Sequence, residues 1–350
     1  MFDRIFNLFS HDLAIDLGTA NTLVLVKGEG IKIAEPSVIA LNKKTGKIIA
    51  VGRKAEPMLG KTPPDIIAVR PLKEGVISDF EATVKMLEHY IKKLHKDSLS
   101  QIIGPRPKVV VGIPSSITEV ERRAVVKTVR QAKARQCFLV DEPMAAAIGA
   151  GLEVTPPTGN LIADIGGGTS EVALISLSGI VTGISLRKAG ESMDQNIIDF
   201  VKKEKGLIIG PKTAERCKIE IGSALVEAEN RGEKKTTGEV RGREMASGLP
   251  RAVTLSSGEI ALAVSPTLQA IINTIKEVLE ESPPELVSDV QKKGLTLAGG
   301  GCLLSDIDTL FSKELGIKVA RAKDPQTCVV RGCGFLLDNK ELLDRVSYHD

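Results

Sequence analysis

The stretch DIGGGTSEVALISL, residues 164–177, decides the fold. NLIAD, which leads into it, is apolar and β-prone, and EVALISL alternates well enough for a second strand, so we expect a β-hairpin around a glycine turn. Because glycine has no Cβ and tolerates positive φ, the backbone N–H groups of Gly166, Gly167 and Gly168 can approach a ligand closely. A concave row of N–H groups binds anions. The simpler alternative, a hairpin turn that binds nothing, stays open at this point.

The same pattern occurs near the N-terminus, in DLAIDLGTANTLVLVKGEGI, residues 12–31. Aligning Asp16 with Asp164 places Gly18 on Gly166 and Asn21 on Thr169. In each copy an Asp ends an apolar strand, small residues turn the chain, and a returning strand follows a hydroxyl or amide side chain. Such internal similarity predicts two similar halves.

A third glycine cluster lies in GLTLAGGGCLLSDI, residues 294–307. This segment predicts a strand, a turn at residues 299–301 and a helix that begins near Leu303. A helix N-terminus after a tight glycine turn attracts polar and anionic ligands. Two hairpins and a third glycine turn together predict a nucleotide site. Asp16 and Asp164 have no basic partner in the sequence and suit a hydrated Mg²⁺, which prefers oxygen ligands.

Other local signals predict individual helices and one further hairpin. Thr118 with Glu121 three residues later predicts a capping box at the start of a helix. SPTLQAIINTIKEVLEES, residues 265–282, predicts a long amphipathic helix. The charged, glycine-rich residues 228–250 predict a hairpin. Strand-rich and helical blocks alternate along the chain, which indicates the α/β class.

Four of these motifs resemble those of the actin, Hsp70 and sugar-kinase ATPase superfamily. DLGTANT is similar to its first phosphate loop, DIGGGTSE to the second, LAGGGCLL to its adenosine motif, and VDEPMAAAIGAGL to the segment with the catalytic carboxylate. More narrowly, the chain resembles the MreB family of bacterial actin homologues, because GKTPPDIIAVRPLKEGVISDF, ITEVERRAV, TAERCKIEIG, SGLPRAVTL and PPELVSDV occur in the family's order. This resemblance covers nearly the whole chain. Asp141, Ser170 and Cys302 stand where the family more often has Glu, Thr and Ser, and none of these departures removes a catalytic group.

The resemblance implies an actin-like α/β ATPase fold. We expect two lobes, each with a ribonuclease-H-like mixed sheet and a small subdomain, and a nucleotide in the cleft. The implied boundaries are residues 1–39, 73–156 and 326–350 for subdomain IA, 40–72 for IB, 157–192 and 257–325 for IIA, and 193–256 for IIB.

The resemblance also implies ATP and Mg²⁺ as ligands. Asp16 and Asp164 are expected to bind Mg²⁺ through water, Glu142 to orient the attacking water, and Thr169 to help place it. Just before Pro143, Glu142 could equally be a simple charge at a helix N-terminus. The expected nucleotide-binding residues are Gly18, Thr19, Ala20, Asn21, Gly166, Gly167, Gly168, Thr169, Glu215, Arg216, Cys217, Lys218, Ala298, Gly299, Gly300 and Gly301. A surface salt bridge is the alternative for Glu215 and Lys218, which lie one helical step apart.

Charge, cysteine content and hydrophobicity argue against several other classes of protein. The net charge of +3, from 47 basic and 44 acidic residues, is too balanced to argue for a nucleic-acid partner. Five scattered cysteines are typical of a reduced, cytosolic protein, and a metal site at Cys328 and Cys333 is disfavoured because no His lies near them. No apolar run reaches the roughly 18 residues of a membrane span, and no signal peptide is visible. AEPMLGKT, residues 55–62, mimics a P-loop but starts with Ala and is followed by two prolines.

Two segments are candidates for contact with a membrane surface. MFDRIFNLFSHD, residues 1–12, predicts an amphipathic helix whose apolar side carries Phe2, Ile5, Phe6 and Phe9. Ile102 and Ile103 lie in a polar loop, residues 97–108, beside Arg106 and Lys108, and the resemblance implies a membrane-inserting loop there. The alternative for either segment is packing against the protein's own core.

The resemblance implies an ATPase that assembles with copies of itself on the inner face of the cytoplasmic membrane, determines rod shape and guides cell-wall synthesis. Expected partners are the chain itself, the membrane and cell-elongation proteins such as MreC, MreD and RodZ, without nucleic acid. A small-molecule kinase or a chaperone-type ATPase of the same superfamily remains the alternative. We find neither a spare acceptor pocket nor a peptide-binding domain in the 350 residues.

Overall fold

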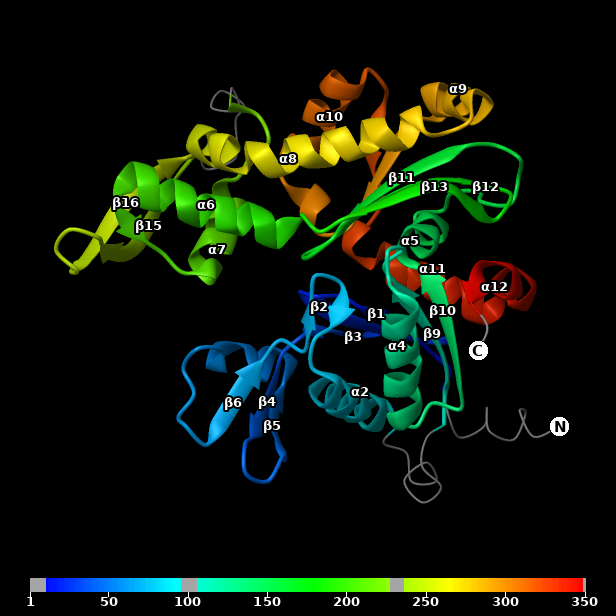
Figure 1. The fold of residues 1–350 in the computed structure, drawn as a ribbon, viewed down its shortest axis with the longest axis horizontal. Helices are drawn as coiled ribbons and strands as arrows, with labels where there is room; N and C mark the ends of the chain where they lie inside the picture. The colour runs from blue at the N-terminus through cyan, green and yellow to red at the C-terminus, as the bar shows by residue number, and fades with distance from the viewer. Residues whose placement is uncertain (1–10, 96–105, 227–235, 349–350) are drawn as a thin grey trace. The chain divides into compact units, whose positions relative to one another are not determined.

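The structure, a computed structural model, describes residues 11–95, 106–226 and 236–348 (Figure 1). The candidate membrane residues Phe2, Ile5, Phe6, Phe9, Ile102 and Ile103 lie outside the described residues. The chain forms two compact units. The first comprises Met1–Thr158, Ile175–Val181 and Gln326–Asp350, and the second comprises Gly159–Leu174 and Thr182–Pro325. The finer division into four subdomains stays a prediction.

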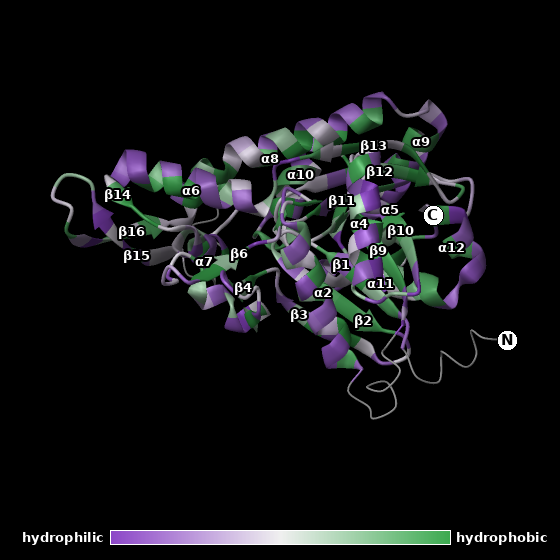
Figure 2. Cartoon of the chain, turned by 60° about the horizontal axis from the view of Figure 1, so that its bottom comes forward, coloured by the Kyte–Doolittle hydropathy of each residue, from purple (hydrophilic) through white to green (hydrophobic). Residues whose placement is uncertain are grey.

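A six-stranded sheet organises the first unit, in the order β19-β10-β9-β1-β2-β3. β1 runs parallel to β9, β9 runs parallel to β10, and β1 pairs antiparallel with β2, as the predicted hairpin requires. The strands are β1 (Leu13–Leu17), β2 (Asn21–Val26), β3 (Gly30–Pro36), β9 (Lys108–Ile113), β10 (Gln136–Asp141) and β19 (Ser347–Tyr348). In Figure 2 the strands of this sheet are mostly green, hydrophobic, whereas α4 carries purple, hydrophilic residues.

Helices cover the six-stranded sheet. Ala82, Met86, Tyr90 and Val129, from α2 and α4, pack in one core with the strands, and α11 contacts β1 and β9. The capping box predicted at Thr118 and Glu121 is present at the start of α4. The helices are α2 (Phe80–Leu94), α4 (Glu119–Gln131), α5 (Glu142–Gly149), α11 (Cys328–Asp338) and α12 (Lys340–Val346).

A small three-stranded sheet, β5-β4-β6, completes the first unit with the short hairpin of β7 and β8. Val38, Ala40 and Ala55 form its core. Residues 55–62, the P-loop mimic, run through a 3₁₀ turn, and a strand rather than a helix follows them. The elements are β4 (Ile39–Asn42), β5 (Ile48–Val51), η1 (Gly52–Lys54), η2 (Glu56–Met58), β6 (Ile66–Val69), β7 (Leu72–Lys73) and β8 (Val76–Ile77).

A five-stranded sheet, β13-β12-β11-β17-β18, organises the second unit, and a three-stranded sheet, β14-β15-β16, accompanies it. The strands are β11 (Asn160–Ile165), β12 (Ser170–Ser176), β13 (Gly179–Leu186), β14 (Leu207–Ile208), β15 (Thr237–Glu244), β16 (Pro250–Ser256), β17 (Leu295–Ala298) and β18 (Val319–Arg321). The helices are α6 (Gly190–Lys205), α7 (Pro211–Ile221), α8 (Ser257–Glu280), α9 (Pro284–Lys293), η4 (Gly301–Leu303), α10 (Ile307–Leu315) and η5 (Pro325–Thr327).

The two main sheets repeat one topology. The order β3-β2-β1-β9-β10 in the first unit matches β13-β12-β11-β17-β18 in the second. In each unit the strand before a glycine turn lies between its hairpin partner and a parallel strand. The prediction of two similar halves is therefore confirmed at the level of strand order.

Three local predictions need correction. No α-helix begins near Leu303, because Leu304 is extended (φ −53°, ψ 131°) and Asp306 is left-handed (φ 61°), so η4 follows the glycines and α10 starts at Ile307. The long helix α8 starts at Ser257 rather than near residue 265, because Ser256 and Glu259 form a capping box there. The predicted hairpin at residues 228–250 is displaced, since β15 and β16 pair from Thr237 to Ser256.

Candidate functional site

Asp16 and Glu142 lie at one edge of the six-stranded sheet. Asp16 pairs with Gly112 of β9, and Gly112 pairs in turn with Val140 of β10. Glu142 follows the last residue of β10 and is the first residue of α5. Because parallel strands present their carboxyl ends at the same edge, where α/β proteins bind ligands, the structure brings these two predicted acids together.

Glu142 is buried, whereas Asp16 is half-buried. Glu142 is only 9% exposed. A Cβ on Gly112 would lie 2.7 Å from Val329 Cγ1, which would have to shift, and in ordinary contact, 3.5 Å, with Glu142 Cγ. Burial raises the pKa of the Asp16 carboxyl to about 7. It also raises the pKa of the Cys333 thiol, and the charges of Asp16 and Glu142 raise it further.

This electrostatic pattern fits a cation. Desolvation is the cause of the raised pKa at Asp16, and a cation bound nearby would lower this pKa again. Among the described residues no group of three or more His, Cys, Asp and Glu side chains is placed to hold a metal ion. A Mg²⁺ that keeps most of its waters needs only one or two carboxylates.

In the first glycine turn, residues 18–21, hydrogen bonds from neighbouring segments hold the carbonyl groups on one side. The backbone N–H of Ser37 donates to Ala20 O at 2.9 Å, and the Ser37 hydroxyl donates to Gly18 O at 2.6 Å. Thr19 Oγ1 accepts from the N–H of Gly75 at 2.9 Å. In a planar trans peptide the N–H points opposite to the C=O, so the N–H groups of Thr19 and Asn21 point away from Ser37.

The second glycine turn, residues 166–169, closes on itself and rests on a helix. Gly166 N–H donates to Thr169 O at 2.9 Å. At the start of α6, the N–H groups of Gly190 and Glu191 donate to Gly166 O at 3.2 Å and to Gly167 O at 2.8 Å. By the same planarity argument, the N–H groups of Gly167 and Gly168 point away from α6. This turn therefore also presents donors on one side.

The third glycine cluster lies beside the second. Asp164 in β11 pairs with Ala298, the last residue of β17, so both clusters stand at the carboxyl edge of the same sheet. Gly299 has φ 80°, and a Cβ there would collide with Ile165 O and lie 2.5 Å from Asp164 Oδ1. Only glycine allows this close approach. The predicted neighbourhood of Asp164 and residues 298–301 is thus present in the second unit.

Lys218 pairs with Asp194 and not with Glu215, the partner in the alternative salt bridge. Its Nζ lies 2.8 Å from Asp194 Oδ1 and donates to Gly190 O at 2.8 Å, whereas Glu215 is exposed. Burial raises the pKa of Asp194 to about 6, and Lys218 opposes this shift. The ion pair of Lys218 is therefore a link from α7 to α6 and to the turn that α6 supports.

The neighbours of Lys218 on α7 differ in their surroundings. Arg216 pairs with Glu220 at 3.5 Å on the surface. Cys217 is buried in the core.

Several residues of the site escaped the sequence analysis. Ser37, Gly75, Gly190 and Asp194 all contact a glycine turn or its support. Gly75 lies in one of the family's stretches, residues 60–80, that carried no site prediction, and the other three lie outside the quoted motifs. The one available signal is that Ser37 follows Pro36 between two apolar runs, where a strand must change direction.

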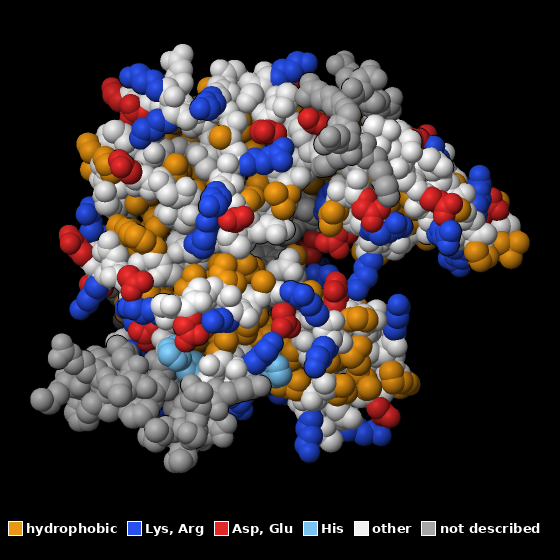
Figure 3. Space-filling view, turned by 180° about the vertical axis from the view of Figure 1, so that it is seen from behind, with side chains coloured by type: hydrophobic (Ala, Val, Ile, Leu, Met, Phe, Trp, Pro, Cys, Tyr) orange, Lys and Arg blue, Asp and Glu red, His pale blue; other side chains and the backbone are white. Residues whose placement is uncertain are grey.

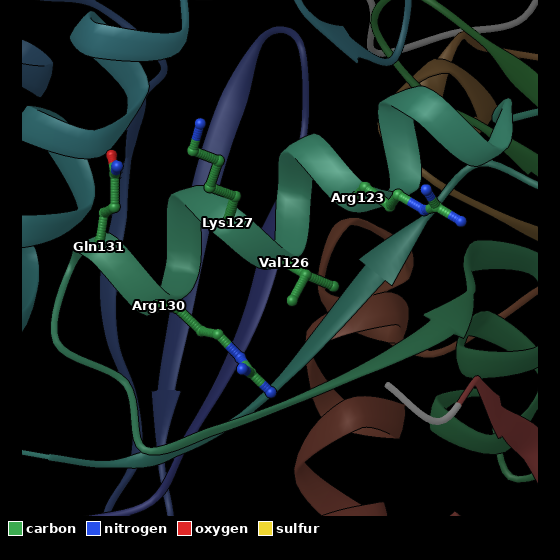
Figure 4. A pocket seen from close by; sticks show the side chains of 5 residues that line it. All are labelled: Arg123, Val126, Lys127, Arg130 and Gln131. Atoms are coloured by element: carbon green, nitrogen blue, oxygen red, sulfur yellow. The ribbon is translucent and has the colours of Figure 1, made fainter.

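A surface hollow of about 420 Å³ lies elsewhere, on α4. Figure 4 shows its lining side chains extending from successive turns of this one helix: Arg123, Val126, Lys127, Arg130 and Gln131. Since α4 connects parallel strands β9 and β10, its second half returns toward the amino edge of the sheet, away from Asp16 and Glu142. On the face shown in Figure 3, basic and acidic side chains are interspersed.

No helix among the described residues is both long enough and apolar enough to cross a membrane. Of the two segments expected to touch a membrane surface, residues 1–10 and 97–105 lie outside the described residues, whereas residues 11–12 and 106–108 are described. His11 N–H donates to His95 Nε2 at 3.1 Å, and Asp12 Oδ1 accepts from Lys108 N–H at 2.9 Å and from Arg135 Nη2 at 3.2 Å. The residues that border both segments are thus in contact with one another.

Comparison with known proteins gives consistent results. A family model described as MreB/Mbl protein matches residues 10–345. The chain is 48% identical over 342 residues to the cell shape-determining protein MreB of Escherichia coli (strain K12), covering 97% of this chain and 96% of that protein. It is 43% identical over 338 residues to the cell shape-determining protein Mbl of Bacillus subtilis (strain 168), covering 97% and 99%.

A solved structure is similar throughout. The crystal structure of MreB 5 of Spiroplasma citri bound to AMPPNP superposes with a TM-score of 0.87 at 35% sequence identity, covering 95% of this chain and 97% of that one. The expectation of an actin-like α/β ATPase fold is thereby confirmed.

Proposed function

This chain belongs to the MreB/Mbl family, and from that premise we propose that it binds and hydrolyses ATP and forms membrane-associated filaments that determine rod cell shape and guide cell-wall synthesis. The proposal of ATP binding rests mainly on a feature that occurs in both units. In both units an aspartate precedes a glycine turn whose carbonyls are tied from behind, at the carboxyl edge of parallel strands.

The backbone N–H groups around residues 19–21 and 167–169 bind the β- and γ-phosphates in this proposal. Preorganised N–H donors stabilise charge that spreads over the phosphate oxygens without reorganising at the moment of reaction. Residues 298–301 and α7 residues 215–218 contact the adenosine. Support for the ligand class comes from the relative from Spiroplasma citri, whose structure was solved bound to AMPPNP, an analogue of ATP.

Asp16 and Asp164 hold Mg²⁺ through water in this proposal, and a bound Mg²⁺ neutralises charge on the phosphates. Glu142 orients the attacking water as a carboxylate acceptor, and Thr169 helps place it. The position of Glu142 supports this role, because this buried acid lies at the carboxyl edge of parallel strands, where α/β proteins bind ligands. Hydrolysis and release of phosphate change which nucleotide is bound. Because the bound nucleotide favours one conformation of the chain, it also affects the contacts between copies in a filament.

The proposals of filament formation and of a location at the membrane rest on the family, not on contacts within this single chain. We propose that copies of this chain assemble on the inner face of the cytoplasmic membrane, with residues 1–9 and 97–108 as the membrane-contacting segments. The contacts of His11 with His95 and of Asp12 with Lys108 support a joint role, because they hold the borders of both segments together. MreC, MreD and RodZ are the proposed partners in cell elongation.

Phosphate release by the purified chain with MgATP tests the catalytic part. We expect slow hydrolysis that EDTA abolishes and that rises when filaments form. Transfer of the γ-phosphate to a metabolite, with no polymer formed, would instead favour a small-molecule kinase.

Pelleting with anionic liposomes tests the membrane part. ATP-dependent pelleting is expected for the full chain, and deletion of residues 1–9 is expected to weaken it strongly, because an array of weak anchors acts through avidity. The matched control is the full chain without liposomes, which separates polymer sedimentation from lipid binding. Equal pelleting with and without lipid would remove the membrane from the proposal.

A further inference from the structure

Ser37 occupies the crossing between two sheets of the first unit. It follows Pro36, the last residue of β3 in the six-stranded sheet, and precedes β4 of the three-stranded sheet. Its neighbour Val38 belongs to the small core of that second sheet, and Val38 O accepts from Gly52 N–H at 2.8 Å. The residue itself is fully buried. A polar side chain at such a place must have hydrogen-bond partners.

The hydroxyl of Ser37 has two partners, and its proton is assigned by elimination. Ser37 Oγ lies 2.6 Å from Gly18 O, which can only accept, so the Ser37 O–H donates to it. Thr22 Oγ1 lies 2.8 Å from Ser37 Oγ, and therefore Thr22 is the donor of that second bond. Thr22 is fully buried as well. The order of donation is thus Thr22 to Ser37 to Gly18.

The backbone of Ser37 acts on the same turn. Its N–H donates to Ala20 O at 2.9 Å, so one residue holds two carbonyls of the first glycine turn. With Gly18 O and Ala20 O both directed at Ser37, planarity directs the following N–H groups, those of Thr19 and Asn21, to the opposite side. Those are two of the donors assigned to the phosphates.

We propose that Ser37 is a positioning residue for the nucleotide: its hydroxyl fixes the Gly18 carbonyl and its N–H fixes the Ala20 carbonyl, so that the N–H donors of Thr19 and Asn21 are oriented before ATP binds. This inference rests on the proposed ATP binding and adds to it a residue outside every motif. Ser37 does not touch the ligand, and its effect is preorganisation, which raises affinity by removing the cost of ordering the turn.

A matched pair of variants distinguishes an effect on the orientation of the phosphate turn from a general loss of stability. Ser37→Ala removes the bond to Gly18 O, whereas Thr22→Val removes a buried hydroxyl from the same chain of bonds but leaves Ser37 donating to Gly18 O. Ser37→Ala loses two buried hydrogen bonds, to Gly18 O and from Thr22 Oγ1, and Thr22→Val loses only the second, so we expect the larger decrease in melting temperature for Ser37→Ala. Only Ser37→Ala is expected to weaken nucleotide binding, by about three- to tenfold, the worth of one hydrogen bond.

The experiment measures the Kd of a fluorescent ATP analogue with Mg²⁺, together with kcat and KM for phosphate release, for the full chain and both variants. Weaker binding by Ser37→Ala with binding by Thr22→Val within about twofold of the wild type supports the inference. Equal binding by all three proteins, or equal weakening by both variants, overturns it and leaves ATP binding standing. Absence of binding by the wild type overturns the proposed function and this inference together.

A second variant covers the case in which Ser37→Ala does not fold. Ser37→Cys keeps a side chain of similar size with a weak S–H donor, and its affinity is expected between those of Ser37→Ala and the wild type. Wild-type affinity in a folded Ser37→Cys protein with unchanged kcat and KM would count against the inference.

Discussion

The two glycine turns present N–H donors by different means. In the first unit, the side chain and N–H of Ser37 hold Gly18 O and Ala20 O. In the second, the N–H groups of Gly190 and Glu191 at the start of α6 hold Gly166 O and Gly167 O. The first N–H groups of a helix have no partner within it, so the turn carbonyls satisfy α6 and α6 orients the turn. In both turns, then, hydrogen bonds hold the carbonyls on one side and leave the N–H groups on the other. The donors can come from a side chain and its N–H, as with Ser37, or from the N-terminus of a helix, as with α6.

The two units differ more at the third parallel strand. In the first unit β10 ends at Asp141 and is followed by the buried Glu142. In the second unit the corresponding strand, β18, ends at Arg321, which pairs with Asp308. The repeat therefore extends to the aspartates and the turns but not to the acid assigned to the attacking water. Binding is expected to depend on both units, whereas the acid that orients the water belongs to the first unit.

Loss of either aspartate should have the largest effect. Asp16→Asn and Asp164→Asn each remove one negative charge without changing shape, and we expect phosphate release at saturating MgATP to fall by about 100-fold or more in both. Phosphate-release assays over a Mg²⁺ titration measure this, with circular dichroism as the control for folding. A large loss in only one variant would show that the two halves are not equivalent toward the metal.

Glu142→Gln should affect only the chemical step. We expect kcat to fall by about 100-fold with KM nearly unchanged, because an oriented water is lost but the phosphate contacts are kept. Asp141→Asn is the matched control, since Asp141 precedes Glu142 and accepts a hydrogen bond from Tyr348 OH at 3.0 Å. Steady-state kinetics measure kcat and KM for both variants. An equal fall in kcat in both would mean that the effect comes from the local structure at the start of α5.

The equivalent glycines Gly18 and Gly166 should tolerate alanine differently. A Cβ on Gly18 would lie 2.7 Å from Asn21 O, whereas one on Gly166 would lie 3.1 Å from Thr169 O. We expect Gly18→Ala to lower the free energy of unfolding by about 2 kcal/mol and Gly166→Ala by less than about 1 kcal/mol, because the closer contact forces the backbone to move. Urea denaturation of the two variants measures the difference. The reverse order would mean that the first turn is the more adaptable one.

The smallest expected effect concerns the support of the second turn and depends on pH. Burial raises the pKa of Asp194 to about 6 from an ordinary 3.8, so between about pH 4 and 6 the folded chain keeps a proton that the unfolded chain has released. The free energy of unfolding should therefore decrease as pH rises through this window, by at most about 2 kcal/mol. Asp194→Asn should remove this decrease.

Urea denaturation of the wild type and Asp194→Asn at pH 4.5, 5.5 and 6.5 measures this difference. Glu191 and Glu215 also raise the pKa of Asp194 and are kept in both proteins, so the comparison isolates Asp194 itself. A wild type that becomes more stable relative to Asp194→Asn as pH rises would contradict the assignment.

The sequence by itself determined the elements that depend on neighbouring residues. The hairpins around Asp16 and Asp164 and the capping box of Thr118 follow from patterns within about ten residues, where periodicity and caps indicate local structure directly. The family resemblance rested on such motifs too, and the family and the fold are confirmed.

Tertiary structure alone decided what holds the site in shape. The bonds from Ser37 to Gly18 and from Lys218 to Gly190 span 19 and 28 residues. The start of α10 at Ile307 depends on a left-handed Asp306 whose carboxylate accepts from Ser223, 83 residues away. No periodic pattern encodes such pairs, because they form only when separate elements pack and bury polar groups that must then find partners.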